Sequence, residues 1–530
     1  MRQVRDLIIK LVLISICVLA GFCTQNSSEF REISVATLRD KIAGGWAGKM
    51  IGVSYGGPTE FRYNGVINED DIPWDPASLR NSIWEDDLYV QMSFMMTIDE
   101  DGMDAPAERF AEAFANAGYM LFHANRKARK NVWDGIMPPK SGHPEYNLHA
   151  DDIDFQIEAD FIGFMNPGMP RSANEMCDKI GHIMNYGDGV YGGMFVSALY
   201  TAAYFDDDIP SIVNTALKSI PAESQYARCI QDVIAGHRQH HDDWRATWQD
   251  IQAKWGTVDI CGALDHFNID AKINGAYIVM GLLYGGSDFE KTIEISTRCG
   301  QDSDCNPSNA AGVLGIILGY DQIPDQWTQY ISEIAEENFI HTSYSFNRVV
   351  ERTLEYAQQL IVSHGGTVEN GTCRIHMQNP VSPELEQSFP SLKPDYRTTI
   401  EDREGWEWGG KWADIEHQQW GTSEYQKVAE GPGASCTFTF QGSGAVIMGR
   451  WDRDGGKADV FVDDQFVRQI DNYYWMEETG AGFHWLNGAH LFHILNLSPG
   501  KHTIKMTVSD MRNPESSGTK LRISRAIVYK

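Results

Sequence analysis

Residues 297–320 read TRCGQDSDCNPSNAAGVLGIILGY, and they set Asp302 and Asp304 directly before a run of small and apolar residues. Asn306 and Pro307 follow the two acids, and an asparagine followed by proline is typical of the start of a helix. Carboxylates this close repel each other unless a proton, a base or a metal ion compensates them. The chemistry of this pair therefore depends on which other groups reach it.

A second acidic group lies in residues 81–92, NSIWEDDLYVQM, which carry Glu85, Asp86 and Asp87 where another helix should begin. Acids in a first helical turn are ordinary, because they interact favourably with the helix dipole. Two such groups, each before an apolar helix of one core, instead predict carboxylates that converge. An oxygen-only set of this kind suits hard divalent ions such as Mg²⁺.

The elements that must position these acids are helical from residue 34 to 362. Leu38, Ile42, Trp46 and Met50 recur at a spacing of four, with small glycines between them that allow a neighbouring helix to approach closely. Other stretches are apolar almost throughout, which indicates helices at the centre of the domain. These stretches are residues 195–205, 273–286 and 309–320. We therefore expect an all-α domain.

The character of the chain changes after that domain. Residues 363–395 are rich in Pro, Gly and Ser and are interpreted as a linker. From residue 396 to 530, runs of period two separated by turn signals predict a β-sandwich of the jelly-roll or galactose-binding-like kind, which is expected to be an accessory domain. Its tryptophans would either stack on sugars or fill the core: Trp406, Trp408, Trp412, Trp451, Trp475 and Trp485.

The N-terminus is expected to be an export signal over residues 1–23, because basic residues precede a short apolar stretch. Cys23 resembles a lipoprotein attachment site, so any membrane association is expected through a lipid anchor there. The chain is expected in the periplasm or on the outer cell surface. A net charge of −29 argues against a nucleic-acid partner. The seven later cysteines include no CxxC pair, so free buried thiols are expected, with one or two disulfides as the alternative.

Four segments, in this order, resemble the ADP-ribosylglycohydrolase family over residues 34–362. That resemblance implies an all-α fold that holds two Mg²⁺ ions, with Mn²⁺ as an alternative, between its helices. The pair Asp302 and Asp304 before a small-residue helix is its most specific part. The segments are AGKMIGVSYGGPTEF, WEDDLYVQM, NYGDGVYGGMF and CGQDSDCNPSNAAGVLGIILG.

The resemblance assigns the metal ligands position by position. The family's first metal triplet falls on Glu85, Asp86 and Asp87, with Glu85 in place of threonine. The second motif falls on Asp302 and Asp304. In that motif Cys305 replaces threonine, and we expect the threonine's role to be lost or taken by water.

The resemblance also implies the reacting and substrate-binding groups. Glu60 matches a flap glutamate, although Val53 replaces an aspartate earlier in that element. Glu60 and Asp304 are thus the expected catalytic acids. A glycine-rich substrate loop matches Gly187, Asp188 and Gly189, followed by Tyr191 and Gly192, although a lone tyrosine is more often a packing residue.

Residues 149–165 add Asp152 and Asp154, which are predicted to bind sugar hydroxyls. The alternative is that these acids form a solvated helix face, because Asp154 and Glu158 are four residues apart and therefore lie on the same side of a helix.

Three functions remain open from the sequence. The first is a Mg²⁺-dependent glycoside hydrolase that cleaves an N- or O-glycosidic bond of ADP-ribose or of a similar ribosyl or furanosyl substrate. The second is an exported glycan-processing glycosidase on the same scaffold whose sugar is not ADP-ribose. The third is a non-catalytic carbohydrate-binding protein that a metal stabilises. The expected partner is a small-molecule or glycan substrate.

Overall fold

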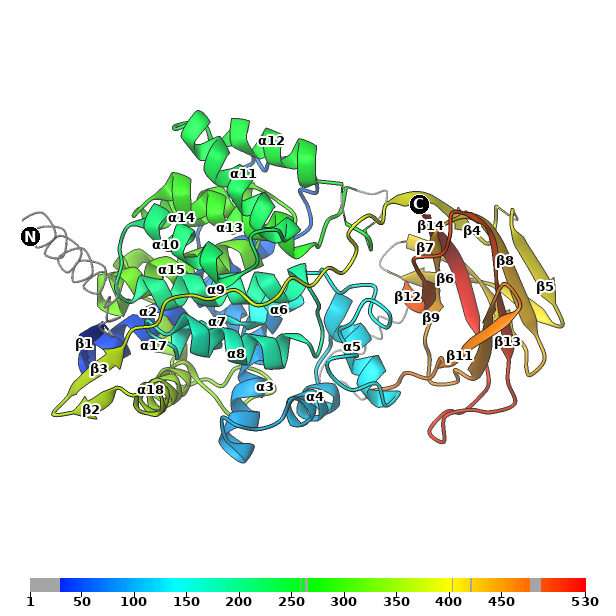
Figure 1. Cartoon of the computed structure of the whole chain (residues 1–530), viewed down its shortest axis with the longest axis horizontal. Coiled ribbons are helices and arrows are strands. Elements are labelled where there is room, and N and C mark those ends of the chain that lie inside the picture. The colour runs from blue at the N-terminus through cyan, green and yellow to red at the C-terminus, as the bar shows by residue number, and fades with distance from the viewer. Residues whose placement is uncertain (1–28, 258, 263–265, 403, 420–421, 477–487) are drawn as a thin grey trace, which may run out of the picture.

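A computed structural model describes residues 29–530 except 258, 263–265, 403, 420–421 and 477–487. A domain of packed helices is followed by a domain of antiparallel sheets, so the fold class predicted from the sequence is confirmed (Figure 1). The predicted export signal with Cys23, and Trp485, lie outside the described residues. Within those residues, no helix has the length and apolar character needed to cross a membrane.

Two helices at the centre of the helical domain touch backbone to backbone. Helix α2 (Val35–Gly56) carries a glycine at every fourth position of the face that meets α15 (Cys305–Leu318). A Cβ atom at Gly48 would lie 2.2 Å from the Ala311 carbonyl oxygen, and one at Gly52 would lie 2.3 Å from the Pro307 oxygen. The close approach predicted from the glycine spacing is confirmed. It fixes the start of α15, where the paired aspartates lie.

The other helices pack around this pair and bury one continuous apolar core. They are α3 (Asp86–Asp101), α4 (Ala107–Asn116), α5 (His123–Trp133), α6 (Asp154–Glu158), α7 (Asp160–Phe164), α8 (Pro170–Gly181), α9 (Asp188–Ala203), α10 (Ile209–Ala216), α11 (Gln225–Gln239), α12 (Trp244–Trp255), α13 (Ala271–Gly285), α14 (Phe289–Arg298), α16 (Asp325–Thr328), α17 (Ile331–Ile334) and α18 (Phe346–Ser363). Short 3₁₀ turns join them: η1 (Gly57–Thr59), η2 (Pro76–Trp84), η3 (Leu217–Ser219) and η4 (Tyr320–Gln322).

The segment predicted as a linker is partly ordered against the helical domain. Strands β2 (Thr367–Glu369) and β3 (Thr372–His376) form a hairpin that pairs with β1 (Phe30–Ser34). After the hairpin the chain crosses the helices in an extended path (Figure 1). On this path Glu386 contacts His182 and Phe389 joins a buried cluster, so the segment is held along its length.

The C-terminal domain has two antiparallel sheets. One runs β11-β10-β13-β8-β5 and the other runs β12-β9-β14-β7-β6, with β4 also pairing with β14. Alternate side chains of the strands point inward, as the period-two pattern predicted. The strands are β4 (Pro394–Thr399), β5 (Trp406–Gly409), β6 (Trp412–Gln419), β7 (Thr422–Ala429), β8 (Ser435–Gly442), β9 (Gly444–Arg450), β10 (Lys457–Val462), β11 (Gln465–Asp471), β12 (Ala489–Ile494), β13 (Gly500–Val508) and β14 (Arg522–Tyr529).

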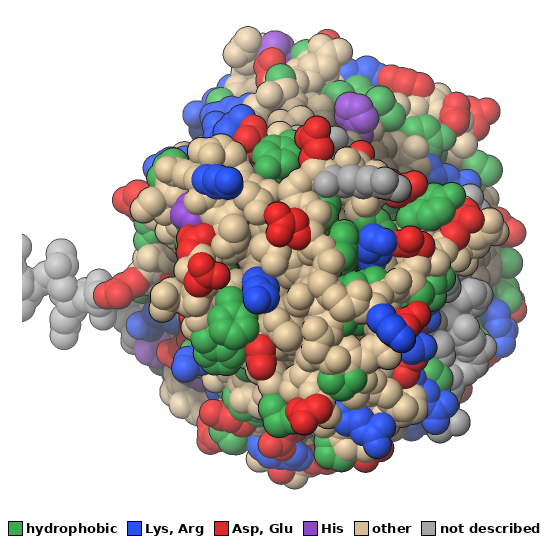
Figure 2. Space-filling model, turned by 90° about the vertical axis from the view of Figure 1, so that its right-hand side faces the viewer, with side chains coloured by type: hydrophobic (Ala, Val, Ile, Leu, Met, Phe, Trp, Pro, Cys, Tyr) green, Lys and Arg blue, Asp and Glu red, His purple; other side chains and the backbone are tan. Residues whose placement is uncertain are grey.

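Most of the described sandwich tryptophans serve packing. Trp406 and Trp451 are buried in the sandwich core, and Trp408 and Trp412 pack against it. Trp475 lies under the guanidinium of Arg453. Figure 2 shows the sandwich end of the molecule, where acidic and basic side chains are interspersed and apolar ones lie singly or in small groups.

The two domains share a buried apolar cluster. Leu148 and Ile260 of the helical domain pack with Met448 and Tyr529 of the sandwich. The Tyr529 hydroxyl donates to the Ile260 carbonyl at 3.0 Å. The seven described cysteines are free thiols, as expected. The sandwich is therefore joined to the helical domain by packing and hydrogen bonds at this cluster.

Candidate metal centre

Two helix N-termini bring the predicted acids together. Helix α3 has Asp86 and Asp87 in its first turn, with Glu85 at its N-cap, and Asp304 is the N-cap of α15. Carboxylate oxygens of Asp87 and Asp304 lie within 4.8 Å of each other, and so do those of Glu60, Asp302 and Asp304. We call Glu60, Glu85, Asp86, Asp87, Asp302 and Asp304 the acid cluster.

The acids of this cluster strongly oppose each other's ionisation. Removal from water and the charges of Asp304 and Asp86 raise the pKa of Glu85 to about 9. Burial and the charge of Asp87 raise the pKa of Asp304 to about 6. Glu60 lies at the exposed rim, yet partial desolvation and repulsion by Asp304 raise its pKa to about 9. Among the described residues, the positive charge beside the cluster thus does not balance the negative charge of its carboxylates.

Two oxygen atoms in the cluster have no partner among the described residues. Asp302 and Asp304 are only 3% and 4% exposed, and Oδ1 of each is buried without a hydrogen bond. A buried carboxylate oxygen without a partner is costly, and a cation is the group that would satisfy it. The oxygen-only donors fit Mg²⁺ or Mn²⁺.

One cluster member, Asp87, is held by groups of the chain itself. The buried ammonium of Lys49 lies 3.4 Å from Asp87 Oδ1 and 2.9 Å from Asp160 Oδ2. The Cys305 thiol donates to Asp87 Oδ2 at 3.0 Å. Lys49 and Asp160 were not predicted from the sequence, because a lysine within a glycine-rich apolar helix gives no sign of its partners.

The predicted sugar ligands Asp152 and Asp154 are buried and already have partners. Asp154 accepts backbone N–H groups of Ala124 and Asn125 at 3.2 and 3.0 Å and so caps the start of α5. Asp152 Oδ2 lies 2.6 Å from His149 Nδ1. The alternative of a solvated face is wrong for Asp154 and Glu158, because both are buried. Their contact with a substrate stays a prediction.

The glycine-rich loop serves close packing in this structure. Gly187 adopts φ +54° before α9, and a Cβ atom at Gly189 would lie 2.3 Å from the Ala150 carbonyl oxygen. At Gly192 the Cβ atom would lie 2.8 Å from Gln156 Oε1.

The polar residues of the same loop have partners within the chain. Asp188 Oδ1 accepts the Tyr226 N–H, and its Oδ2 lies 3.7 Å from Lys272 Nζ. The Tyr191 hydroxyl donates to the Glu384 carbonyl, so it contacts the extended segment rather than the acid cluster. Substrate binding by this loop stays a prediction.

A row of rings lies beside the acid cluster. Phe61, the residue after Glu60, packs against Phe267 with ring centroids 5.1 Å apart, and Phe267 stacks on His123 at 5.8 Å. Phe61 and Phe267 also pack on the buried group that contains Cys305. Sequence reasoning missed this row, because its members come from three distant segments.

Comparison with known proteins identifies the helical domain. A family profile described as ADP-ribosylglycohydrolase matches residues 34–362. A solved structure described as an ADP-ribosylglycohydrolase-related protein complex is 13% identical with a TM-score of 0.43, over 61% of this chain and 98% of that one. A two-domain esterase active on acetylated mannans is 12% identical with a TM-score of 0.20, over 39% and 54% of the two chains. Likenesses this weak carry no functional argument. A search of curated proteins gave no significant match.

Proposed function

Because the chain belongs to the ADP-ribosylglycohydrolase family, we propose that it is a divalent-metal-dependent glycosidase. Its substrate would carry an N- or O-glycosidic bond of ADP-ribose or of a similar ribosyl or furanosyl group. Family membership by itself supports the coarser description, a glycosidase-type hydrolase. The observation that carries the metal dependence is the pair of buried, unpartnered oxygens on Asp302 and Asp304.

The carboxylates of Glu85, Asp86, Asp87, Asp302 and Asp304 would hold Mg²⁺, with Mn²⁺ as the alternative. When bound, the ions would compensate the crowded negative charge and acidify a nearby water. Lys49 and the Cys305 thiol would keep Asp87 in a fixed orientation, because each binds a different oxygen of that carboxylate. A fixed ligand limits the reorganisation needed to bind the ion.

The chain's own reacting groups would be Glu60 and Asp304. Glycosidic cleavage passes through an oxocarbenium-like transition state, in which positive charge develops at the anomeric carbon. Carboxylates beside that carbon would stabilise the charge. Glu60 at the rim would accept the proton of the attacking water once bound cations lower its pKa from about 9. The ring row at Phe61 and Phe267 would exclude bulk water from one side.

The substrate class has a second candidate, an exported glycan whose sugar is not ADP-ribose. The observation that favours it is the sandwich, which is packed tightly onto the helical domain within a few residues of Asp152. The predicted export signal points the same way. The third candidate, a binding protein without catalysis, would use the same ion as a structural group only.

A substrate panel tests these candidates. ADP-ribosyl-arginine, ADP-ribosyl-serine, nucleosides and furanosyl glycans would be incubated with the protein in Mg²⁺, in Mn²⁺ and in excess chelator. We expect hydrolysis of at least one substrate, lost with chelator and lost in Asp304→Asn. A folded, metal-binding protein that hydrolyses none of them would refute the glycosidase and support the binding protein.

A further inference from the structure

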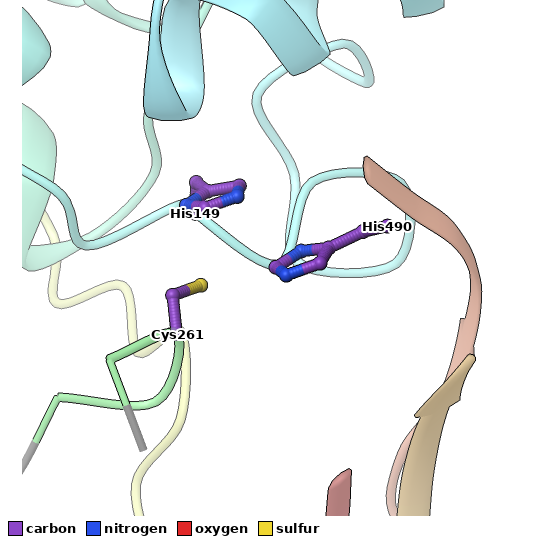
Figure 3. A group of neighbouring side chains, drawn as sticks. All are labelled: His149, Cys261 and His490. Carbon is purple, nitrogen blue, oxygen red and sulfur yellow. The ribbon is translucent and has the colours of Figure 1, made fainter. Parts of the chain in front are cut away.

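Three side chains from both domains meet away from the acid cluster. His149 and Cys261 belong to loops of the helical domain, and His490 lies on β12 at the edge of the sandwich (Figure 3). One ligand atom from each residue lies within 4.8 Å of those of the other two. We call these residues the interdomain triad. Two imidazoles and a thiol are the donors that zinc-like ions prefer.

His149 is oriented as a metal ligand would be. Its Nδ1 lies 2.6 Å from Asp152 Oδ2, so this carboxylate would accept the Nδ1 proton when a cation binds Nε2. Metal-binding histidines usually have such an outer partner, which fixes the ring and its tautomer.

His490 has an unsatisfied nitrogen within this group. The side chain is 4% exposed, and its Nδ1 is buried without a hydrogen-bond partner among the described residues. Leaving such a donor or acceptor unpaired in the interior destabilises the folded chain. A metal ion would satisfy this nitrogen, whereas the neutral ring by itself does not.

We propose that His149, Cys261 and His490 bind one transition-metal ion of the zinc type at the boundary between the two domains. This site would be chemically distinct from the acid cluster, because sulfur and nitrogen donors do not suit Mg²⁺. Asp152 or Asp259 would complete the coordination, since oxygens of both lie within 4.8 Å of Cys261 Sγ and of each other.

Binding requires a small local rearrangement. The two imidazoles are stacked, with centroids 4.4 Å apart and planes inclined by 6°, so one ring must turn about its Cβ–Cγ bond to share an ion. Tetrahedral zinc sets nitrogen and sulfur donors about 3.3–3.6 Å apart, and the ligand atoms of the triad lie within 4.8 Å of one another. The Cys261 thiol now donates to the Leu148 carbonyl at 3.1 Å. Binding would release that proton to solvent as the zinc–sulfur bond forms.

A metal ion bound in this way would connect the two domains beside the loop that carries Asp152. The ion would fix His149 and the sandwich edge relative to each other, and it would do so whether or not the chain is a glycosidase. The inference therefore goes beyond the proposed function and can be tested without any substrate.

The test uses the full mature chain, stripped with a chelator and titrated with Co²⁺ and Zn²⁺ in an Asp302→Asn background that weakens the acid cluster. We expect one tight Co²⁺ equivalent with a thiolate-to-cobalt charge-transfer band, displaced by Zn²⁺. Cys261→Ser should abolish the band, and His490→Ala should weaken binding at least tenfold. Cys373→Ser, a buried thiol on β3, is the matched control and should bind normally.

A second measurement does not depend on the variants folding. One equivalent of Zn²⁺ should protect Cys261 of the unmutated chain from alkylation, read by peptide mass spectrometry, whereas Mg²⁺ should not. The proposal is overturned if the unmutated chain shows no thiolate band and no protection of Cys261. It is equally overturned if Cys261→Ser binds Co²⁺ with the same affinity and spectrum.

Discussion

The Cys305 sulfur lies 3.0 Å from Asp87 Oδ2, and this contact joins the first turns of α3 and α15. The other Asp87 oxygen faces Lys49. A thiol is a poor ligand for a hard ion, so the sequence predicted that the role of the replaced threonine was lost. That prediction, with water as the alternative holder of the role, stays a prediction, and the structure adds that the thiol is a donor to a member of the acid cluster. Cys305 is thus placed to orient Asp87 rather than to bind metal.

The first prediction follows from this contact. Cys305→Ala removes the donor and leaves Asp87 Oδ2 without it, so Mg²⁺ affinity should fall by about 3–10-fold, within the range of one weak hydrogen bond. Cys305→Thr restores a hydroxyl donor and should recover most of the affinity. Isothermal titration calorimetry measures both. Cys299→Ala, another buried thiol at the end of α14, should leave affinity unchanged. Equal losses at both cysteines would contradict the orienting role.

Much of the fold was accessible from local patterns. The four-residue spacing of apolar residues gave the helical domain, and period-two runs gave the sandwich, because each pattern reports which face is buried. The glycines of α2 predicted close contact with a neighbouring helix. Asp302 and Asp304 were found because a second acidic group precedes another apolar helix of the same core, so the two groups together predicted convergence.

The rest depends on contacts between distant segments. The partners of Lys49, the ring row at Phe267 and the interdomain triad involve residues tens or hundreds of positions apart, and no spacing rule connects them. His149 had no visible partner in the sequence, because Cys261 and His490 reach it only after both domains fold. Likewise, the cap that Asp154 forms on α5 joins residues 30 positions apart, and no local pattern reveals it.

The second prediction concerns the contact between α2 and α15. In Gly52→Ala the new Cβ would lie 2.3 Å from a backbone oxygen, so the helices must separate and the free energy of unfolding should fall by about 2–4 kcal/mol. Mg²⁺ binding should weaken as well, because the start of α15 would shift. Gly57→Ala is the matched control, since its Cβ has open space within 4 Å. Urea unfolding compares the two, and similar stabilities would show that the close approach is not required.

The third prediction concerns the unpartnered oxygens. Mg²⁺ at 100 times its dissociation constant should stabilise the folded chain by about 2.7 kcal/mol, seen as a rise in Tm. Asp302→Asn removes a ligand and should abolish most of that rise without unfolding the metal-free protein. Asp325→Asn, an exposed aspartate on α16, should respond to Mg²⁺ like the unmutated chain. A full Mg²⁺ response in Asp302→Asn would exclude this residue as a ligand.

The fourth prediction is a pH dependence at the segment after β3. His182 Nε2 lies 3.0 Å from Glu386 Oε2. Burial opposes the charged ring, but the Glu386 hydrogen bond and charge outweigh it and raise the pKa of His182 above 6.5. Burial likewise opposes charge on Glu386, and His182 outweighs it and lowers the pKa of Glu386 below 4.5.

The sign of the effect follows from these two directions. The His182 contribution is complete below pH 6.5 and is lost as pH rises through its raised pKa, whereas the Glu386 contribution is complete above pH 4.5 and is lost at more acid pH. His182→Gln should therefore lower the free energy of unfolding most, by about 1 kcal/mol, between roughly pH 4.5 and 6.5. Urea unfolding at several pH values measures this. His240→Gln, in a surface pair with Asp250, should cost little at any pH.

The last prediction concerns the dependence of the helical domain on the sandwich. Removing residues 394–530 takes away Ile527 and Tyr529 of β14, which share a buried cluster with Leu148 and Ile260. It also frees the loop of His149 and Asp152 from His490. We therefore expect the truncated chain to be less stable than the full chain and to lose most of its turnover of a small soluble substrate.

The control is Tyr529→Phe in the full chain, which removes only the hydrogen bond to Ile260. It should lower the free energy of unfolding by about 1 kcal/mol and leave turnover unchanged. Circular dichroism, thermal unfolding and turnover compare the three proteins. A truncated chain that folds with unchanged stability and turnover would mean that the sandwich is an accessory module and that the shared cluster is not needed for the site.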